Sequence, residues 1–516
     1  MALRDMQQNI KHVVHLMLEN RGFDHVLGWL WNNSNNPPTV NIPSLRPGEA
    51  RFYGVPQDSS GSPVLWFPGD PSFYQNAPYT GPQKYVHKGL WGYCYMPKSD
   101  PGEGWDDVTQ QIFGPYSQMD LPPEKLMRGF YLNYVADGTG LGSDDDILAT
   151  GTPTDLSVIN GLAAAYAVSD TWFASAPTET NPNRAFSLAG TSEFRQNNLS
   201  FDGVPYAGLR TIFGVLNDTK NSWKLYADYT WIHGRYFTQY MFPEGMDQGA
   251  FGSISDFASD VLNDALPVFS YLEPTFAVET ELNPLGNDYH PPGSVYDGET
   301  FLQGVYDALV ANPDVFAKTL LIVTFDEHGG TLDHVVPPDA VPPDELDPPY
   351  MFGRYGVRVP TILISPWVPP GCVFRAGYYP GGSGGTPFDH TSVLATLCKW
   401  LNIPYQKPTD VGWLRHRTAS APTFEGVITS NCNNAIAIAS PYDCSDFTAA
   451  GSVSGLAPAQ VQALLARVTN FHTGDPRLHA LMAEVASTCR SKEDVGKLLM
   501  RLRREYGSVR RDRKVT

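Results

Sequence analysis

The clearest pattern in the sequence is a pair of apolar runs that each stop abruptly at polar residues. Residues 10–18 run into Glu19 and Asn20, and residues 319–325 run into Asp326 and Glu327, which two glycines follow. Runs without a polar side are typical of strands buried on both faces. Because open α/β sheets place their active sites at the carboxyl ends of such strands, both junctions are candidate sites.

Further elements follow from the same periodicity. Shorter apolar runs predict strands at residues 222–226, 268–272 and 359–364. Helical spacing predicts helices at residues 297–311 and 390–401, and the alanine-rich residues 157–169 are helical in character. The alternation of buried strands with helices predicts an α/β fold, in which a mostly parallel central sheet carries helices on both faces.

Composition changes along the chain suggest two parts. Residues 30–130 are rich in Pro, Gly, Asn and aromatic residues, which predicts a loop-rich lid insertion that roofs a site. Amphipathic helices are expected within residues 456–490, and a basic tail follows residue 492. We therefore expect a main domain over residues 1–422 and a C-terminal helical extension over residues 423–516.

Charge and composition exclude several classes of protein. The 516 residues carry 54 acidic and 36 basic side chains, and a net charge of −18 argues against binding to nucleic acid or general adhesion to anionic membranes. No apolar run reaches the length of about 18 residues that a transmembrane helix needs. The first residues lack the apolar core of a signal peptide, which predicts a cytosolic protein, or a secreted one whose leader is absent from this chain.

The six cysteines do not follow a zinc-binding pattern. Cys432 and Cys444 flank a short loop, and this spacing would allow them to pair in an oxidising compartment. The compartment itself stays open, because the cysteine count is compatible with either redox state.

Oxygen donors dominate the candidate site. Two junctions offer the carboxylates and amide named above, and a third segment offers Thr180, which stands before an Asn-Pro-Asn turn that leads into a helix. All-oxygen sets suit a hard divalent cation. A threonine at a helix start faces N–H groups that attract phosphate, so Thr180 is a candidate nucleophile. The plainer alternatives are a helix cap for Thr180 and a solvated acid pair for Asp326 and Glu327.

Several longer motifs then stand together in one order. They are Glu19-Asn-Arg-Gly-Phe-Asp-His25, Thr180-Asn-Pro-Asn-Arg184, His290-Pro-Pro, Asp326-Glu-His-Gly-Gly and Phe388-Asp-His-Thr-Ser392. With these motifs the chain resembles, over about residues 10–404, the phosphoesterase family of bacterial phospholipases C and an acid phosphatase, within the alkaline phosphatase superfamily. The resemblance implies an alkaline phosphatase-like fold and the hydrolysis of phosphoric esters, with the main domain as the catalytic one.

The resemblance also assigns roles to residues. It implies that one divalent cation is held by Glu19, Asn20, Thr180, Asp326 and Glu327. Oxygen ligands favour Mg²⁺, Ca²⁺ or Mn²⁺, and Zn²⁺ is an alternative. Thr180 would form a phospho-threonine, for which Thr178 is the second choice, and His290 would give a proton to the leaving alkoxide. The expected substrate is a phosphoester small molecule or a phospholipid head group.

A further group of residues is expected near the substrate or behind the ligands. It consists of Asp24, His25, Asn183, Arg184, Tyr289, His334 and His390. Arg184 has two readings, because a guanidinium binds two phosphate oxygens at once but serves equally well in a buried ion pair.

Two departures from the family pattern bear on the substrate. Tyr289 and Glu103 stand where many members carry histidine, which removes two potentially cationic groups. This favours phosphodiester cleavage of the phospholipase C type over an acid phosphatase acting on phosphomonoesters. A catalytically silent protein that binds phosphate or lipid is a third hypothesis.

Overall fold

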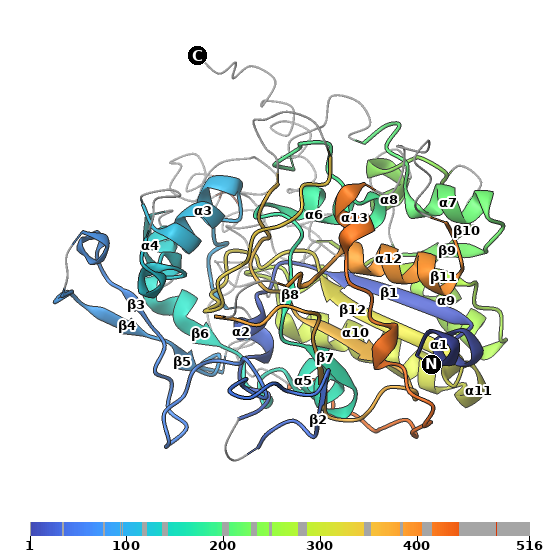
Figure 1. The fold of residues 1–516 in the computed structure, drawn as a ribbon, viewed down its shortest axis with the longest axis horizontal. Helices are drawn as coiled ribbons and strands as arrows, with labels where there is room; N and C mark the ends of the chain where they lie inside the picture. The colour runs from blue at the N-terminus through green and yellow to red at the C-terminus, as the bar shows by residue number, and fades with distance from the viewer. Residues whose placement is uncertain are drawn as a thin grey trace.

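The structure is a computed structural model of the chain. It describes residues 2–32, 36–75, 78–92, 94, 96–115, 121–136, 143–198, 206–228, 235–246, 250–276, 286–344, 352–381, 385–404, 415–442, 481 and 484. These residues form one large sheet with helices packed on both of its faces (Figure 1).

The central sheet has nine strands. In spatial order they are β10 (Ala250–Gly252), β9 (Trp223–Tyr226), β11 (Phe269–Leu272), β1 (His12–Leu18), β12 (Thr319–Phe325), β13 (Thr361–Ile364), β7 (Ala167–Ser169), β14 (Cys372–Phe374) and β2 (Val40–Ile42). All neighbours are parallel except β13, which runs antiparallel to both β12 and β7. The prediction of a mostly parallel sheet is confirmed.

Three small sheets lie beside the large one. They pair β3 (Trp66–Pro68) with β4 (Gln83–Tyr85), β5 (His87–Lys88) with β6 (Ala149–Thr150), and β8 (Trp172–Phe173) with β15 (Phe388–Asp389). The β3–β4 hairpin projects from the edge of the molecule (Figure 1). Short 3₁₀ helices occupy Pro71–Tyr74, Pro123–Lys125, Asp144–Leu148 and Glu425–Val427.

The helices form two layers. One layer contains α1 (Ala2–Asn9), α6 (Thr180–Ala189), α7 (Ile212–Asp218), α12 (Thr391–Trp400) and α13 (His416–Ser420). The other contains α5 (Ser157–Ala165), α9 (Ile254–Leu262), α10 (Val295–Val310) and α11 (Pro313–Phe316). Four more helices are α2 (Phe23–Leu27), α3 (Trp105–Phe113), α4 (Phe130–Ala136) and α8 (Phe237–Met241).

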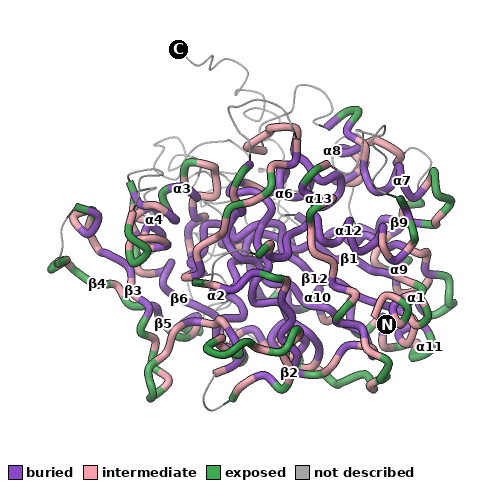
Figure 2. The backbone as a smooth tube through the Cα atoms, viewed as in Figure 1, coloured by how far each residue is buried: buried purple, intermediate pink, exposed green. Residues whose placement is uncertain are grey.

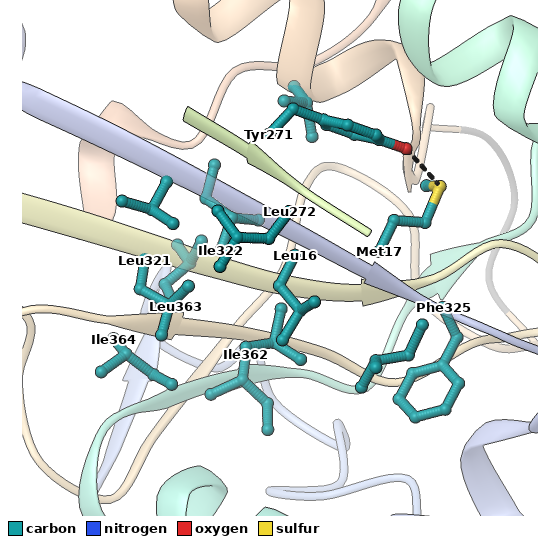
Figure 3. Close-up of a cluster of buried hydrophobic side chains, with 14 of the residues drawn as sticks. Leu16, Met17, Tyr271, Leu272, Leu321, Ile322, Phe325, Ile362, Leu363 and Ile364 are labelled. Carbon is teal, nitrogen blue, oxygen red and sulfur yellow. Dashed lines mark hydrogen bonds between the residues drawn. The ribbon is translucent and has the colours of Figure 1, made fainter. Parts of the chain in front are cut away.

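The core fills the space between the sheet and its helices. Every residue of β12 is buried, as six of the seven in β1 are, because neither face of these strands meets solvent. Figure 2 shows the buried backbone concentrated along these strands, with exposed segments at the rim. In Figure 3, side chains of β1, β11, β12 and β13 form one apolar cluster, where the Tyr271 hydroxyl donates to Met17 Sδ at 3.7 Å. This packed layer gives the strand ends a rigid base.

Most of the predicted elements are confirmed. The five predicted strands correspond to β1, β9, β11, β12 and β13, and the two predicted helices to α10 and α12. Residues 157–169 were only partly helical, because α5 ends at Ala165 and the short strand β7 follows. The insertion over residues 30–130 holds strands and the helix α3 as well as loops.

Three expectations concern the cysteines, the membrane and the C-terminal part. Cys432 is free and exposed, so its pairing with Cys444 was wrong, whereas Cys94 is disulfide-bonded. Among the described residues, no helix is both long and apolar enough to span a bilayer. Cys444, the basic tail and nearly all of residues 456–490 lie outside the described residues, so the helical extension stays a prediction.

Candidate active site

The site begins where two neighbouring strands end. β1 and β12 are parallel, and their register pairs Leu18 with Phe325, so the residues that follow these two lie side by side. The backbone N–H of Asn20 donates to Asp326 Oδ1 at 3.1 Å across this junction. Glu19, Asn20 and Asp326 are at most 1% exposed. The sheet therefore brings together two segments that are about 300 residues apart in the chain.

Tight backbone turns shape both strand ends. Asn20 has a φ of 57°, which is uncommon for a residue with a side chain and is typical of functional sites. Gly329 and Gly330 have φ values of 59° and 64°, so the chain turns sharply after β12. A Cβ atom at Gly329 would lie 2.3 Å from the Asn20 carbonyl oxygen, so only glycine fits there.

Thr180 comes from a third segment and is the first residue of α6. Its Oγ1 donates to Asn20 Oδ1 at 3.4 Å, which places the hydroxyl beside the two strand ends. The preceding turn is held by Asn183, whose Oδ1 accepts from the Ala176 N–H and whose Nδ2 donates to the Thr178 carbonyl. The Thr178 hydroxyl donates to the Gln196 carbonyl. The hydroxyl of Thr180 therefore contacts Asn20 at the strand ends, whereas that of Thr178 is bonded elsewhere.

Arg184 ties the same helix to the strand ends. Its Nε lies 3.1 Å from Asp326 Oδ2 and its Nη2 lies 3.9 Å from Glu19 Oε1, with all three side chains buried. Nη2 also donates to the Met17 and Leu18 carbonyls at 3.3 and 3.4 Å. The structure therefore shows Arg184 in a buried ion pair, the second of the two readings from the sequence.

The acids in this site outnumber the cations that contact them. Burial raises the pKa of Asp326, and the charge of Glu19 adds to this effect although Arg184 opposes it. Burial raises the pKa of Glu327 well above its ordinary value, with further repulsion from Glu103 and Asp326. Glu327 Oε1 is buried and has no hydrogen-bond partner. An orphaned carboxylate oxygen beside other oxygen donors fits the coordination of a hard divalent cation.

Two groups of acids and histidines are packed more tightly than this set. Among the described residues, ligand atoms lie within 4.8 Å of one another in the group Asp100, Glu103 and His290, and in the group Asp24, Asp333 and His334. Neither group contains Asp326 or Glu327. The first group adjoins the site through the hydrogen bond between Glu103 and Asn20. The second group lies around Arg358.

His290 reaches the site through Glu103. His290 Nδ1 donates to the Pro291 carbonyl at 2.6 Å, and its Nε2 lies 3.5 Å from Glu103 Oε2. The same Glu103 oxygen accepts a hydrogen bond of 2.5 Å from Asn20 Nδ2. Asp100 Oδ1 lies 3.6 Å from His290 Nδ1. A histidine with acids on both sides, next to the expected metal ligands, is well placed to hold a proton for a leaving group.

Glu103 is the residue that sequence reasoning missed. The sequence showed it only as a replacement for a family histidine, and its contact with Asn20 spans 83 positions of the chain. One sequence feature could have indicated its role. Asp100 and Glu103 stand just before the start of helix α3, within the insertion that is expected to cover the site.

The hydroxyl of Tyr289 is directed to helix α10 and not to the carboxylates of the site. Its hydroxyl donates to Glu299 Oε1 at 2.5 Å, and its ring packs edge-on against Phe325. Its backbone has a φ of 74°, and its carbonyl accepts from Arg21 Nε at 2.7 Å. These contacts fix the loop that carries His290, which makes Tyr289 a support for that loop in this structure.

The candidates after β1 form a separate buried network. Arg358 Nη2 lies 2.8 Å from Asp24 Oδ1 and 3.0 Å from Asp333 Oδ2. His334 Nδ1 donates to Asp24 Oδ2 at 2.5 Å. His25 is fully buried, and burial, followed by the charge of Arg21, lowers its pKa well below the ordinary value. The network anchors α2 to Asp333 and His334, which follow the turn after β12, and to Arg358 before β13.

Two more histidines, His390 and His328, lie at the segment after β12 that carries two of the expected metal ligands. His390 Nε2 donates to the Asp326 carbonyl at 2.6 Å, and Trp172 Nε1 donates to His390 Nδ1 at 3.5 Å. His328 Nε2 donates to Gln111 Oε1 at 2.7 Å, which links β12 to helix α3. Burial lowers the pKa of His390 to about 4 and that of His328 to about 3, so both rings are neutral supports near neutral pH.

The protein is a phosphoric ester hydrolase. Its α/β fold carries a cluster of acids at the strand ends, near the threonine that starts helix α6. The chain belongs to the phosphoesterase family, whose model matches residues 10–404. This match covers most of residues 1–422, which the sequence predicts to form the main domain.

Known proteins with similar sequences are phospholipases C. The chain is 31% identical over 432 residues to non-specific phospholipase C6 of Arabidopsis thaliana, covering 82% of this chain and 73% of that protein. It is 26% identical over 470 residues to the non-hemolytic phospholipase C of Burkholderia pseudomallei, covering 79% of this chain and 58% of that protein. Among solved structures, a protein of the alkaline phosphatase superfamily from Vibrio parahaemolyticus has a TM-score of 0.31 and 13% identity, covering 53% of this chain and 65% of that one.

Proposed function

We propose that this chain cleaves phosphodiesters of the phospholipase C type, between the alcohol and the phosphate, with Thr180 as nucleophile. The observation that carries the proposal is the position of Thr180. Thr180 is the first residue of helix α6 and its hydroxyl donates to Asn20 at 3.4 Å, while Arg184 of the same helix pairs with the buried carboxylates of Asp326 and Glu19. A hydroxyl that only capped a helix would not need this acidic surrounding.

One divalent cation fits the acidic excess. Glu19, Asn20, Thr180, Asp326 and Glu327 would hold it, and the orphaned Glu327 oxygen supports this assignment. When bound, such an ion lowers the pKa of a coordinated hydroxyl and shields phosphoryl charge. The donors are all oxygen atoms, which favours Mg²⁺, Ca²⁺ or Mn²⁺.

The chain's own residues account for the two chemical steps. Thr180 Oγ1 releases its proton to solvent and bonds to phosphorus while the bond from phosphorus to the alcohol oxygen breaks. His290 gives its Nε2 proton to the departing alkoxide and regains a proton from solvent. Water then cleaves the phospho-threonine, which restores the hydroxyl and releases the phosphomonoester. Asn183 and Arg184 keep Thr180 in place during both steps.

The relatives' names support the diester as substrate, since both are phospholipases C. The test is turnover by the purified chain after dialysis against EDTA and return of Mg²⁺, Ca²⁺, Mn²⁺ or Zn²⁺ in separate samples. p-Nitrophenyl phosphorylcholine and phosphatidylcholine vesicles should be cleaved faster than p-nitrophenyl phosphate. Faster turnover of the monoester would favour an acid phosphatase, and no turnover with any ion would favour a silent binding protein.

A further inference from the structure

Glu103 stands at the outer side of the acidic cluster. Its side chain is 21% exposed, whereas Glu19, Asp326 and Glu327 are at most 1% exposed. It is nevertheless bonded inward, to Asn20 Nδ2 at 2.5 Å, and lies 3.5 Å from His290 Nε2. Glu103 is therefore the most exposed of these four carboxylates.

The backbone around Glu103 is held firmly. Gly102 contacts the turn after β12 so closely that a Cβ atom at Gly330 would lie 2.4 Å from the Gly102 carbonyl oxygen. That carbonyl accepts from Gln111 Nε2 at 2.7 Å, and the Gly104 N–H donates to Asp107 Oδ2 at 3.2 Å. Glu103 is therefore a fixed part of the site wall, and its charge acts at a defined place.

The charges around the phosphate position now have a definite balance. Glu19, Asp326, Glu327 and Glu103 supply four formal negative charges, and Arg184 supplies one positive charge. The His290–Asp100 pair is neutral overall when the imidazole is protonated. A divalent cation leaves one negative charge, which is the charge that Glu103 adds. Without Glu103 the cation-loaded site would be neutral.

We propose that Glu103 selects phosphodiester monoanions over phosphomonoester dianions at this site, an inference that rests on the proposed function. A diester carries a neutral ester oxygen where a monoester carries a second anionic oxygen. The second charge is repelled by a carboxylate fixed beside Asn20 and His290, where partial burial weakens screening by water. The phosphodiester preference is thereby built into one side chain.

The experiment compares two substrates that differ by one charge and share a leaving group. These are p-nitrophenyl phosphate and methyl p-nitrophenyl phosphate, assayed at pH 8, where the monoester is a dianion. In Glu103→Gln, the ratio of monoester to diester kcat/KM should rise by roughly tenfold or more. The control is Asp106→Asn, which removes one exposed carboxylate three residues away on helix α3 and should leave the ratio unchanged.

A binding measurement separates this inference from the proposed function. Affinity for inorganic phosphate, followed by calorimetry with the cation present, should increase in Glu103→Gln and stay the same in Asp106→Asn. If the native chain cleaves neither ester, the proposed function fails, yet the phosphate measurement still tests Glu103. An unchanged ratio together with unchanged phosphate affinity overturns the inference. So does a second equivalent of bound cation that Glu103→Gln loses, because Glu103 would then be a metal ligand.

Discussion

Arg184 and Asp326 are joined by a buried ion pair of 3.1 Å that fixes the start of helix α6 against the end of strand β12. This contact determines where the Thr180 hydroxyl lies relative to the carboxylates, since Thr180 is one turn before Arg184 on the same helix. It also places one positive charge among several buried acids. The proposed cation would act on the same acids that Arg184 contacts.

Replacing Arg184 by Met should lower the free energy of unfolding by about 3–5 kcal/mol in cation-free protein, because Asp326 and Glu19 would lose their buried partner. A bound cation should reduce the loss, since it neutralises the same acids. Urea unfolding in EDTA and in excess Mn²⁺ measures both values. Arg46→Met is the control, because the Arg46–Glu49 pair is on the surface and is worth about 1 kcal/mol or less. Equal losses with and without the ion would contradict the assignment of the cation to this site.

Thr180→Ala should lower kcat by roughly 10⁴-fold or more while the thermal midpoint stays close to that of the native chain, because the variant lacks the attacking oxygen. Thr178→Ala is the matched control. Its hydroxyl donates to the Gln196 carbonyl, so turnover should stay within about tenfold of native. Mass spectrometry of acid-quenched reactions should show phosphate on Thr180 in the native chain. Near-native turnover of Thr180→Ala would exclude the covalent route.

Adding the preferred cation should raise the melting temperature of the native chain. At a concentration 100 times the dissociation constant, the gain is about 2.7 kcal/mol. Glu327→Gln should lose most of this gain, because its orphaned oxygen is a proposed ligand. Asp264→Asn, which removes an exposed acid paired with Lys318, should keep the full gain. A full gain in Glu327→Gln would show that the ion binds elsewhere.

His15 should make the protein sensitive to acid. Burial lowers its pKa to about 3, with smaller effects from His390 and Arg184, while the ring is bonded to Thr324 Oγ1 at 2.8 Å. A histidine with a depressed folded-state pKa contributes stability that is present above about pH 6.5 and is lost as the pH falls toward 3, because only the unfolded chain takes up the proton. Between about pH 6 and 4, the stability advantage of the native chain over His15→Gln should therefore shrink by about 1.4 kcal/mol per pH unit. Denaturation curves at pH 7.5, 5.5 and 4.5 measure it, and a constant difference would contradict the assignment.

The sequence was sufficient to predict the core of the fold and the convergence at its edge. Apolar runs without a polar side identified β1 and β12, and parallel pairing then required Glu19 and Asp326 to be neighbours. The Asn-Pro-Asn turn placed Thr180 at a helix start, as the structure has it. These features are local patterns, or follow directly from them.

Other features depended on contacts that no local pattern reveals. Residues 167–169 continue an alanine-rich helix in composition, yet tertiary pairing with β13 and β14 makes them a strand. The Glu103–Asn20 bond depends on how the insertion folds over the sheet, and the direction of the Tyr289 hydroxyl depends on Glu299 in helix α10. Whether Arg184 meets a carboxylate or a phosphate was likewise a question of packing.

The antiparallel direction of β13 determines where the connection from β12 begins and ends. Because Thr361 at the start of β13 pairs with Thr324 near the end of β12, the connection between these strands leaves and returns at the catalytic edge. The described residues 326–344 and 352–360 of this connection thus begin and end at the edge that carries Glu19 and Asp326, while the strand register is fixed by residues outside it. Because this connection begins with Asp326 and Glu327 and is held by the Asp333–Arg358 ion pair, only substitutions between these anchors would change what the enzyme accepts while keeping the strand-end acids and the sheet.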